Sequence, residues 1–162
     1  EASGTGNMKM ALNGALTIGT LDGANIEIKE EVGDENIFIF GMTAAQVMET
    51  RANGYNPLDY YNANSELKQA LDMIASGFFS IDEPDRYQVV FDMLVHNGDH
   101  FLLLADYDSY VAAQDEVGRV YQNKEEWTRR AVLNVARIGK FSSDRTIDEY
   151  AKNIWKVKPV IR

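Results

Sequence analysis

Four residues near the start of the sequence carry the groups from which a phosphate site can be built. Gly4 and Gly6 flank Thr5, and Lys9 follows three residues after the second glycine. Because glycine adopts backbone conformations closed to other residues, successive N–H groups in this run can converge on one anion. A helix that opens at Met8 would add free N–H groups and a partial positive charge at the same point. The run predicts a phosphate site, with an ordinary glycine-rich turn as the alternative.

Lys9 indicates which class of phosphorylated ligand this site would bind. A dinucleotide-binding fingerprint needs glycine where Lys9 stands, and the Gly-Lys-Ser/Thr of a Walker loop is absent. An amine beside a phosphate nest is what pyridoxal phosphate requires, because the amine forms the Schiff base and the nest holds the phosphate. The sequence therefore indicates a pyridoxal phosphate site at Lys9, with a surface lysine on the first turn of a helix as the alternative.

The segments that must position these residues alternate between strand and helix. Short apolar runs at 16–20 and 36–40 predict buried strands, and residues 25–33 between them predict a helix. Thr43 and Gln46 form a capping-box pair ahead of a further helix. Strand, helix, strand, helix indicates an α/β fold with a parallel sheet.

The rest of the chain is predicted to be mainly helical. Helices are expected over 67–74 and 87–94 and from Asp108, Asn123 and Ser143. The apolar run within 100–104 predicts a third strand. The expected fold class is α/β, an incomplete parallel sheet with many helices, and the 162 residues predict one body with one core.

Composition limits the partners. The formal net charge of -9 gives a surface that repels nucleic acid and acidic lipid, so neither is an expected partner. The chain has no cysteine, which excludes disulfides, thiolate metal ligands and cysteine nucleophiles, and a cytoplasmic location is expected. His96 and His100 are four residues apart without an evident third ligand, so no metal site is predicted.

Residues 1–25 closely resemble the pyridoxal phosphate signature of the α-1,4-glucan phosphorylases. The signature is the run EASGTGNMK followed by MALNGALTIGTLDGAN, and further similar segments lie at 37–41, 104–110 and 139–147. The resemblance covers essentially the whole chain. It identifies residues 1–162 as the C-terminal part of the pyridoxal phosphate-binding domain of a longer enzyme, beginning within the site.

This resemblance implies a GT-B glycosyltransferase with two Rossmann-like domains, in which phosphate cleaves an α-1,4-glucan to α-D-glucose 1-phosphate. Lys9 would carry the pyridoxal phosphate as a Schiff base, and Thr5 and Gly6 would contact the cofactor's phosphate. Contacts to the hydroxyls of the transferred glucosyl unit are implied for Glu1, Ser3 and Gly4.

The resemblance also implies that much of the active site lies outside this chain. The N-terminal domain, the basic residues that grip both phosphates and the glucan channel belong to the missing part, so the chain alone is expected to be inactive. A homodimer or another homo-oligomer is expected, because absent strands would leave apolar faces uncovered.

Two other interpretations stay open. The chain can be a non-catalytic module that binds no cofactor and self-associates. It can also come from a pyridoxal phosphate enzyme of aminotransferase type, in which a carboxylate pairs with the ring nitrogen of the cofactor.

Overall fold

The computed structural model describes residues 4–158, and the chain divides into two compact units. Unit 1 consists of Glu1–Ile39 together with Glu116–Arg162, and unit 2 is Phe40–Asp115. The length predicted one core, whereas each unit has its own cluster of buried apolar side chains. The assignment of the whole chain to one domain of a larger enzyme stays a prediction.

The sheet of unit 1 has two parallel strands. They are β1 (Ile18–Thr20) and β2 (Phe38–Phe40), joined by α2 (Ala24–Val32) and the 3₁₀ turn η1 (Asp34–Asn36). The backbone N–H of Phe38 donates to the carbonyl of Thr17 at 2.9 Å. Both predicted strands and the helix between them are confirmed, although each strand begins two residues later than the apolar runs indicated.

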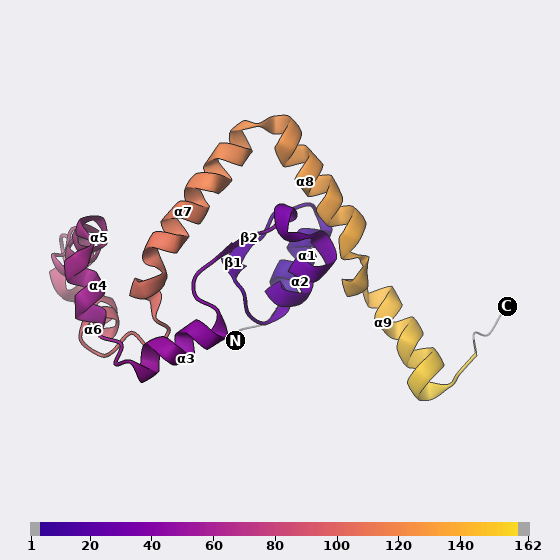
Figure 1. Cartoon of the computed structure of the whole chain (residues 1–162), viewed down its shortest axis with the longest axis horizontal. Coiled ribbons are helices and arrows are strands. Elements are labelled where there is room, and N and C mark those ends of the chain that lie inside the picture. The colour runs from indigo at the N-terminus through magenta and orange to yellow at the C-terminus, as the bar shows by residue number, and fades with distance from the viewer. Residues whose placement is uncertain (1–3, 159–162) are drawn as a thin grey trace. The chain divides into compact units, whose positions relative to one another are not determined.

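Helices from both ends of the sequence complete unit 1. They are α1 (Thr5–Leu12), the last part of α7 (Leu103–Gln122), α8 (Lys124–Arg137), the 3₁₀ turn η3 (Ile138–Phe141), α9 (Ser143–Glu149) and the π-helical turn η4 (Tyr150–Trp155). Figure 1 shows α8 running beside α1 and α2, and the core lies where these helices and η3 meet. Ala11, Ile28, Val32 and Ile138 are fully buried there.

Unit 2 is helical. It contains α3 (Ala44–Ala52), α4 (Pro57–Ala63), α5 (Ser65–Ala75), the 3₁₀ turn η2 (Pro84–Tyr87), α6 (Gln88–Val95) and the first part of α7. The predicted capping box is confirmed, because Thr43 accepts from the N–H of Gln46 and the Gln46 side chain accepts from the N–H of Thr43. The apolar stripes of α5 and α6 bury Leu67, Leu71 and Phe91 as their spacing predicted.

The predicted strand at 100–104 is wrong, because α7 begins at Leu103. Leu102 and Asp99 have φ values of 56° and 38°, which an extended strand cannot contain. The buried carboxylate of Asp99 accepts hydrogen bonds from the Leu104 N–H at 2.8 Å and from the Tyr55 hydroxyl at 2.7 Å. Asp99 therefore stabilises the start of α7. The helix start predicted at Asp108 is wrong, because Asp108 lies inside α7.

Later helix starts agree better with the sequence. Asn123 caps α8, since its side chain accepts from the N–H of Glu126 at 3.1 Å, and α9 begins at Ser143. The observed architecture is thus helix-rich α/β with a small parallel sheet. Within residues 4–158, no helix combines the length and the apolar character that crossing a bilayer needs.

Candidate functional site

Helix α1 carries the predicted amine. Its inner face is apolar, with Ala11 fully buried and Met8 and Leu12 packed against the core of unit 1. This packing fixes the helix, so its opposite face must point away from the core. Lys9 lies on that exposed face, and no described residue forms an ion pair or side-chain hydrogen bond with its ammonium group.

The first turn of α1 supplies the donors, in a geometry different from the predicted one. Gly4 precedes the helix with φ -75° and ψ -3°, and Gly6 lies within it at negative φ. A nest built on special glycine conformations is therefore wrong; the N–H groups are those of an ordinary first helical turn. The N–H groups of Gly6 and Asn7 have no carbonyl partner one turn earlier within the helix, and N–H groups of this kind attract anions. Apart from the neighbouring residues and the backbone of the helix itself, no atom of residues 4–158 lies within 4 Å of a Cβ placed on Gly6, so a ligand can approach the backbone there.

Thr5, Gly6 and Lys9 share one side of the helix, because residues separated by three and four positions are neighbours on its surface. The backbone of Lys9 lies roughly one turn, about 5 Å along the axis, from the N–H groups of the first turn. The arrangement can hold an anion at the helix start and present an amine to a carbonyl group of the same small molecule. Glu1 and Ser3, predicted to contact sugar hydroxyls, lie outside the described residues.

A pair of half-buried amides joins this turn to the sheet. Asn7 Nδ2 donates to Asn25 Oδ1 at 2.8 Å, and Asn25 Nδ2 donates to the carbonyl of Thr20, the last residue of β1, at 3.0 Å. Gly19 lies beside the second amide. This contact cannot be predicted from the sequence, because nothing local links a residue of one helix to a residue 18 positions away in another.

Two other polar residues of the signature have local roles. Asp22 accepts from the Thr20 hydroxyl at 2.7 Å, within the turn between β1 and α2. Asn13 donates to the carbonyl of Lys9 at 2.8 Å and closes the C-terminal end of α1. Neither side chain is tied to the first turn of α1.

Helix α8 supports the elements that carry the site. The buried Asn134 donates through Nδ2 to the carbonyl of Asn36 at 2.9 Å, and Arg137 donates to the carbonyl of Val32 at 2.7 Å. Both bonds join residues about a hundred positions apart and fix the segment between α2 and β2. No local sequence pattern signals either contact.

The electrostatics of α8 centre on Glu126. Arg129 and Arg130 donate to its carboxylate at 2.8 and 2.7 Å. These bonds, first that from Arg129 and then that from Arg130, lower the pKa of Glu126 to about 2. The guanidinium of Arg130 also lies 5.4 Å from the ring centre of Phe38 in β2, so the charged cluster contacts the sheet.

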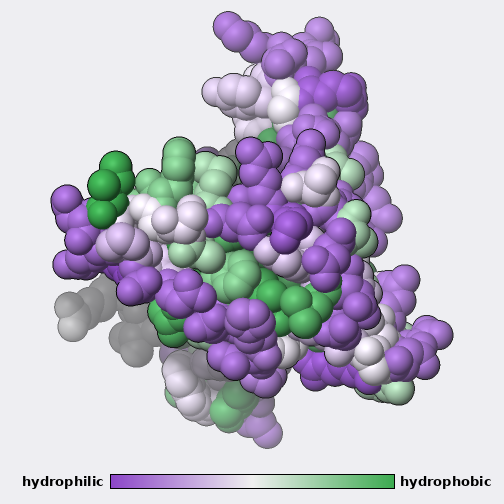
Figure 2. Space-filling model, turned by 90° about the vertical axis from the view of Figure 1, so that its left-hand side faces the viewer, coloured by the Kyte–Doolittle hydropathy of each residue, from purple (hydrophilic) through white to green (hydrophobic). Residues whose placement is uncertain are grey.

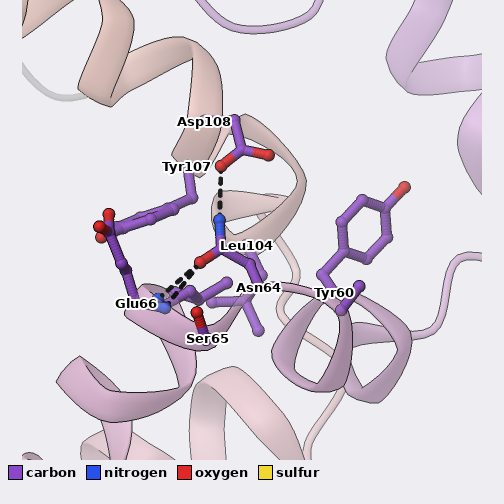
Figure 3. A pocket seen from close by; sticks show the side chains of 9 residues that line it. Tyr60, Asn64, Ser65, Glu66, Leu104, Tyr107 and Asp108 are labelled. Carbon is purple, nitrogen blue, oxygen red and sulfur yellow. Dashed lines mark hydrogen bonds between the residues drawn. The ribbon is translucent and has the colours of Figure 1, made fainter.

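Unit 2 contains a separate hollow of about 370 Å³ where α4, α5 and α7 approach one another. Its lining includes Tyr60, Asn64, Ser65, Glu66, Tyr107 and Asp108. Figure 3 shows Asn64 between two of these residues, accepting from the backbone N–H of Glu66 and donating to Asp108. The lining offers no lysine or arginine to hold a phosphate, so α1 remains the better candidate.

The histidines belong to different local contacts. His96 lies 3.0 Å from a carboxylate oxygen of Asp92, and the backbone carbonyl of His100 accepts from Arg51. Among residues 4–158, no three His, Asp or Glu side chains come together as metal ligands.

Residues 1–157 match the carbohydrate phosphorylase family. A glycogen phosphorylase of Synechocystis sp. is 57% identical over 161 residues, which cover 99% of this chain and 19% of the relative. The human brain and muscle glycogen phosphorylases are 55% and 52% identical over 159 residues, again 98% of this chain and 19% of theirs. The chain spans about a fifth of the length of these curated relatives.

Proposed function

The chain belongs to the carbohydrate phosphorylase family, and we propose that the protein containing it catalyses pyridoxal phosphate-dependent phosphorolysis of an α-1,4-glucan. The products would be α-D-glucose 1-phosphate and a shortened glucan. We further propose that the chain is the C-terminal part of a GT-B fold. Identity above 50% to glycogen phosphorylases of a cyanobacterium and of human tissues supports this function.

The observation that carries the proposal is the exposed face of α1. Lys9 presents an amine there with no described ionic partner, one turn from the N–H groups of Gly6 and Asn7. These residues fit pyridoxal phosphate: Lys9 Nζ would hold the cofactor covalently, while Thr5 and Gly6 would bind its phosphate. Backbone donors and the helix dipole stabilise a charged phosphate and so lower its pKa.

When bound, the cofactor supplies a phosphate group that can share a proton with the inorganic phosphate substrate. The role of this chain is to hold the cofactor phosphate in place and to keep it ionised enough to exchange that proton. We propose that Glu1, Ser3 and Gly4 bind the hydroxyls of the glucosyl unit next to it. They immediately precede the turn that holds the phosphate, so sugar and phosphate would meet at the start of α1.

Pyridoxal phosphate followed by borohydride reduction tests the site. The protein containing this chain is incubated with both reagents, digested and mapped, with Lys9→Ala and Lys124→Ala as variants. Lys124 is an exposed lysine in the first turn of α8, so it reports non-specific labelling. We expect one pyridoxyl group, confined to Lys9 and absent from Lys9→Ala, with unchanged labelling in Lys124→Ala. Labelling spread over several lysines would contradict the proposal.

Activity provides a second measurement. With maltodextrin and phosphate, the whole protein should form glucose 1-phosphate and its Lys9→Ala variant should not. We propose that residues 1–162 alone are inactive, because the chain spans about a fifth of the length of its phosphorylase relatives. Glucose 1-phosphate formed by the purified 162-residue chain would refute that part.

A second candidate function is self-association of a non-catalytic module. Unit 2 exposes large apolar side chains, among them Ile81 at 85% and Phe101 at 89%. Figure 2 shows apolar groups among the hydrophilic ones on the face that it presents. A contiguous exposed apolar patch marks a contact surface, and self-association would cover these side chains. Light scattering of the isolated chain tests this candidate, because a monomer at high concentration counts against self-association.

A further inference from the structure

The amide pair Asn7–Asn25 connects the phosphate-binding end of α1 to the sheet. Asn7 is the third residue of α1, so its own backbone N–H belongs to the turn that faces a ligand. Its side chain donates to Asn25 at 2.8 Å, and its Oδ1 accepts from the N–H of Met8 at 3.0 Å. Both ends of this amide are therefore engaged, which fixes the side chain relative to the first turn.

Asn25 carries the connection onward. It lies in the first turn of α2, where it accepts from Asn7 and donates to the carbonyl of Thr20 at the end of β1. Only an amide performs both tasks, since an aspartate lacks the donor and would bring a negative charge towards a bound phosphate. The contact links α1, β1 and α2 at their polar ends, away from the buried core of unit 1.

Gly19 leaves the space that Asn25 occupies. A Cβ built at residue 19 would lie 2.6 Å from Asn25 Nδ2, well inside van der Waals contact. The obstructing atom is the tip of a side chain, so an alanine there would displace the amide rather than the backbone. Glycine at this position and asparagine at residue 25 thus form one structural unit.

We propose that Asn7 and Asn25 are positioning residues for the cofactor phosphate. Their contact holds the N–H groups of Gly6 and Asn7 in one orientation relative to the sheet, so that the phosphate and the amine of Lys9 are bound together. The inference rests on the proposed function, because it presupposes a cofactor on Lys9. The phosphate end of that site would thus be held in place by a side-chain contact that includes no atom of the cofactor.

The test uses the protein containing this chain and the variants Asn7→Ala, Asn25→Ala and their double variant. Asn13→Ala is the matched control, because it removes one amide hydrogen bond from the other end of α1. Two quantities are measured on the reconstituted protein: the Kd for pyridoxal phosphate and the ³¹P resonance of its phosphate as a function of pH. Neither requires turnover.

Each single variant should weaken cofactor binding about fivefold, the effect expected from one half-buried neutral hydrogen bond. The double variant should bind no more weakly than the worse single variant, because both changes remove the same contact. All three should shift the ³¹P titration, whereas Asn13→Ala should bind and titrate as the unchanged protein does.

Gly19→Ala displaces the Asn25 amide without deleting a hydrogen-bonding group. It should therefore weaken cofactor binding about as much as Asn25→Ala is expected to, and it serves as the test if Asn25→Ala fails to fold. Additive losses in the double variant, or a Gly19→Ala protein that behaves like Asn13→Ala, would overturn the inference. If the unchanged protein takes up no cofactor at Lys9, the proposed function fails and this inference falls with it. Normal labelling of Lys9 with indistinguishable asparagine variants overturns the inference alone.

Discussion

Alanine in place of Gly41 should destabilise unit 2 far more than the same change at Gly54. The two glycines have nearly the same φ, 79° and 85°. They differ in their surroundings. A Cβ on Gly54 would meet no atom within 4 Å, whereas a Cβ on Gly41 would lie 2.7 Å from a carboxylate oxygen of Asp106. Comparing them separates the backbone cost from the steric cost.

The magnitude follows from these two contributions. Placing alanine at such a φ costs about 1 kcal/mol once the lower entropy of the unfolded chain is included. At Gly41 the Asp106 carboxylate must also move, which breaks its 2.9 Å hydrogen bond from the Met42 N–H. A hydrogen bond to a charged group contributes about 1.5–3 kcal/mol. We therefore expect a loss of about 1 kcal/mol for Gly54→Ala and about 3 kcal/mol for Gly41→Ala.

Native-state hydrogen exchange measures this locally, without unfolding the whole protein. Peptides covering the start of α3 and the first half of α7 should exchange roughly a hundredfold faster in Gly41→Ala, and peptides around residue 54 about fivefold faster in Gly54→Ala. In an Asp106→Ala background the clash is gone, so Gly41→Ala should then cost no more than Gly54→Ala. Equal exchange in the two single variants would refute the reasoning.

Two more predictions concern unit 1. The pKa of Glu126 is lowered to about 2 by hydrogen bonds from Arg129 and then Arg130, so its contribution to stability is present above pH 4.5 and is lost as the pH falls towards 2. Glu126→Gln should flatten the acid-unfolding curve over this range, and an unchanged curve would contradict the assignment. Ile138→Ala should cost about 2–4 kcal/mol, because the side chain is fully buried against α1 and α2. Ile147→Ala, at a side chain that is 54% exposed, should change the free energy of unfolding by no more than about 0.5 kcal/mol; urea titration of both variants measures the difference.

Signals contained within a few residues allowed much of the fold to be predicted. The Thr43–Gln46 capping box and the Asn123 cap depend on atoms three residues apart, and both are confirmed. The strand expected at 100–104 failed because a short apolar run fits a strand and a buried helix start equally well. What decided between them was Asp99 and its contact with Tyr55, 44 positions away in the sequence.

Only part of the candidate site could likewise be predicted from local sequence signals. Lys9 and the helix that carries it follow from a contiguous motif, and α1 is present, although it begins at Thr5 and not at Met8 as expected. The predicted glycine nest is wrong because Gly4 and Gly6 take ordinary helical conformations, which no local rule forbids. The Asn7–Asn25 contact was beyond reach from the sequence, since it exists only after two helices pack together.

The packing of α1 against α8 and η3 has a consequence for biosynthesis. An eight-residue helix is not stable by itself in water, so α1 depends on its packing partners. Besides the neighbouring α2, these partners are α8 and η3, which lie more than a hundred residues later in the chain. A ribosome adds about 5–20 residues per second, which leaves Lys9 without its folded surroundings for on the order of ten seconds after it is made. We therefore expect pyridoxal phosphate to bind after this segment has left the ribosome, so that its aldehyde reacts with Lys9 once α1 has folded.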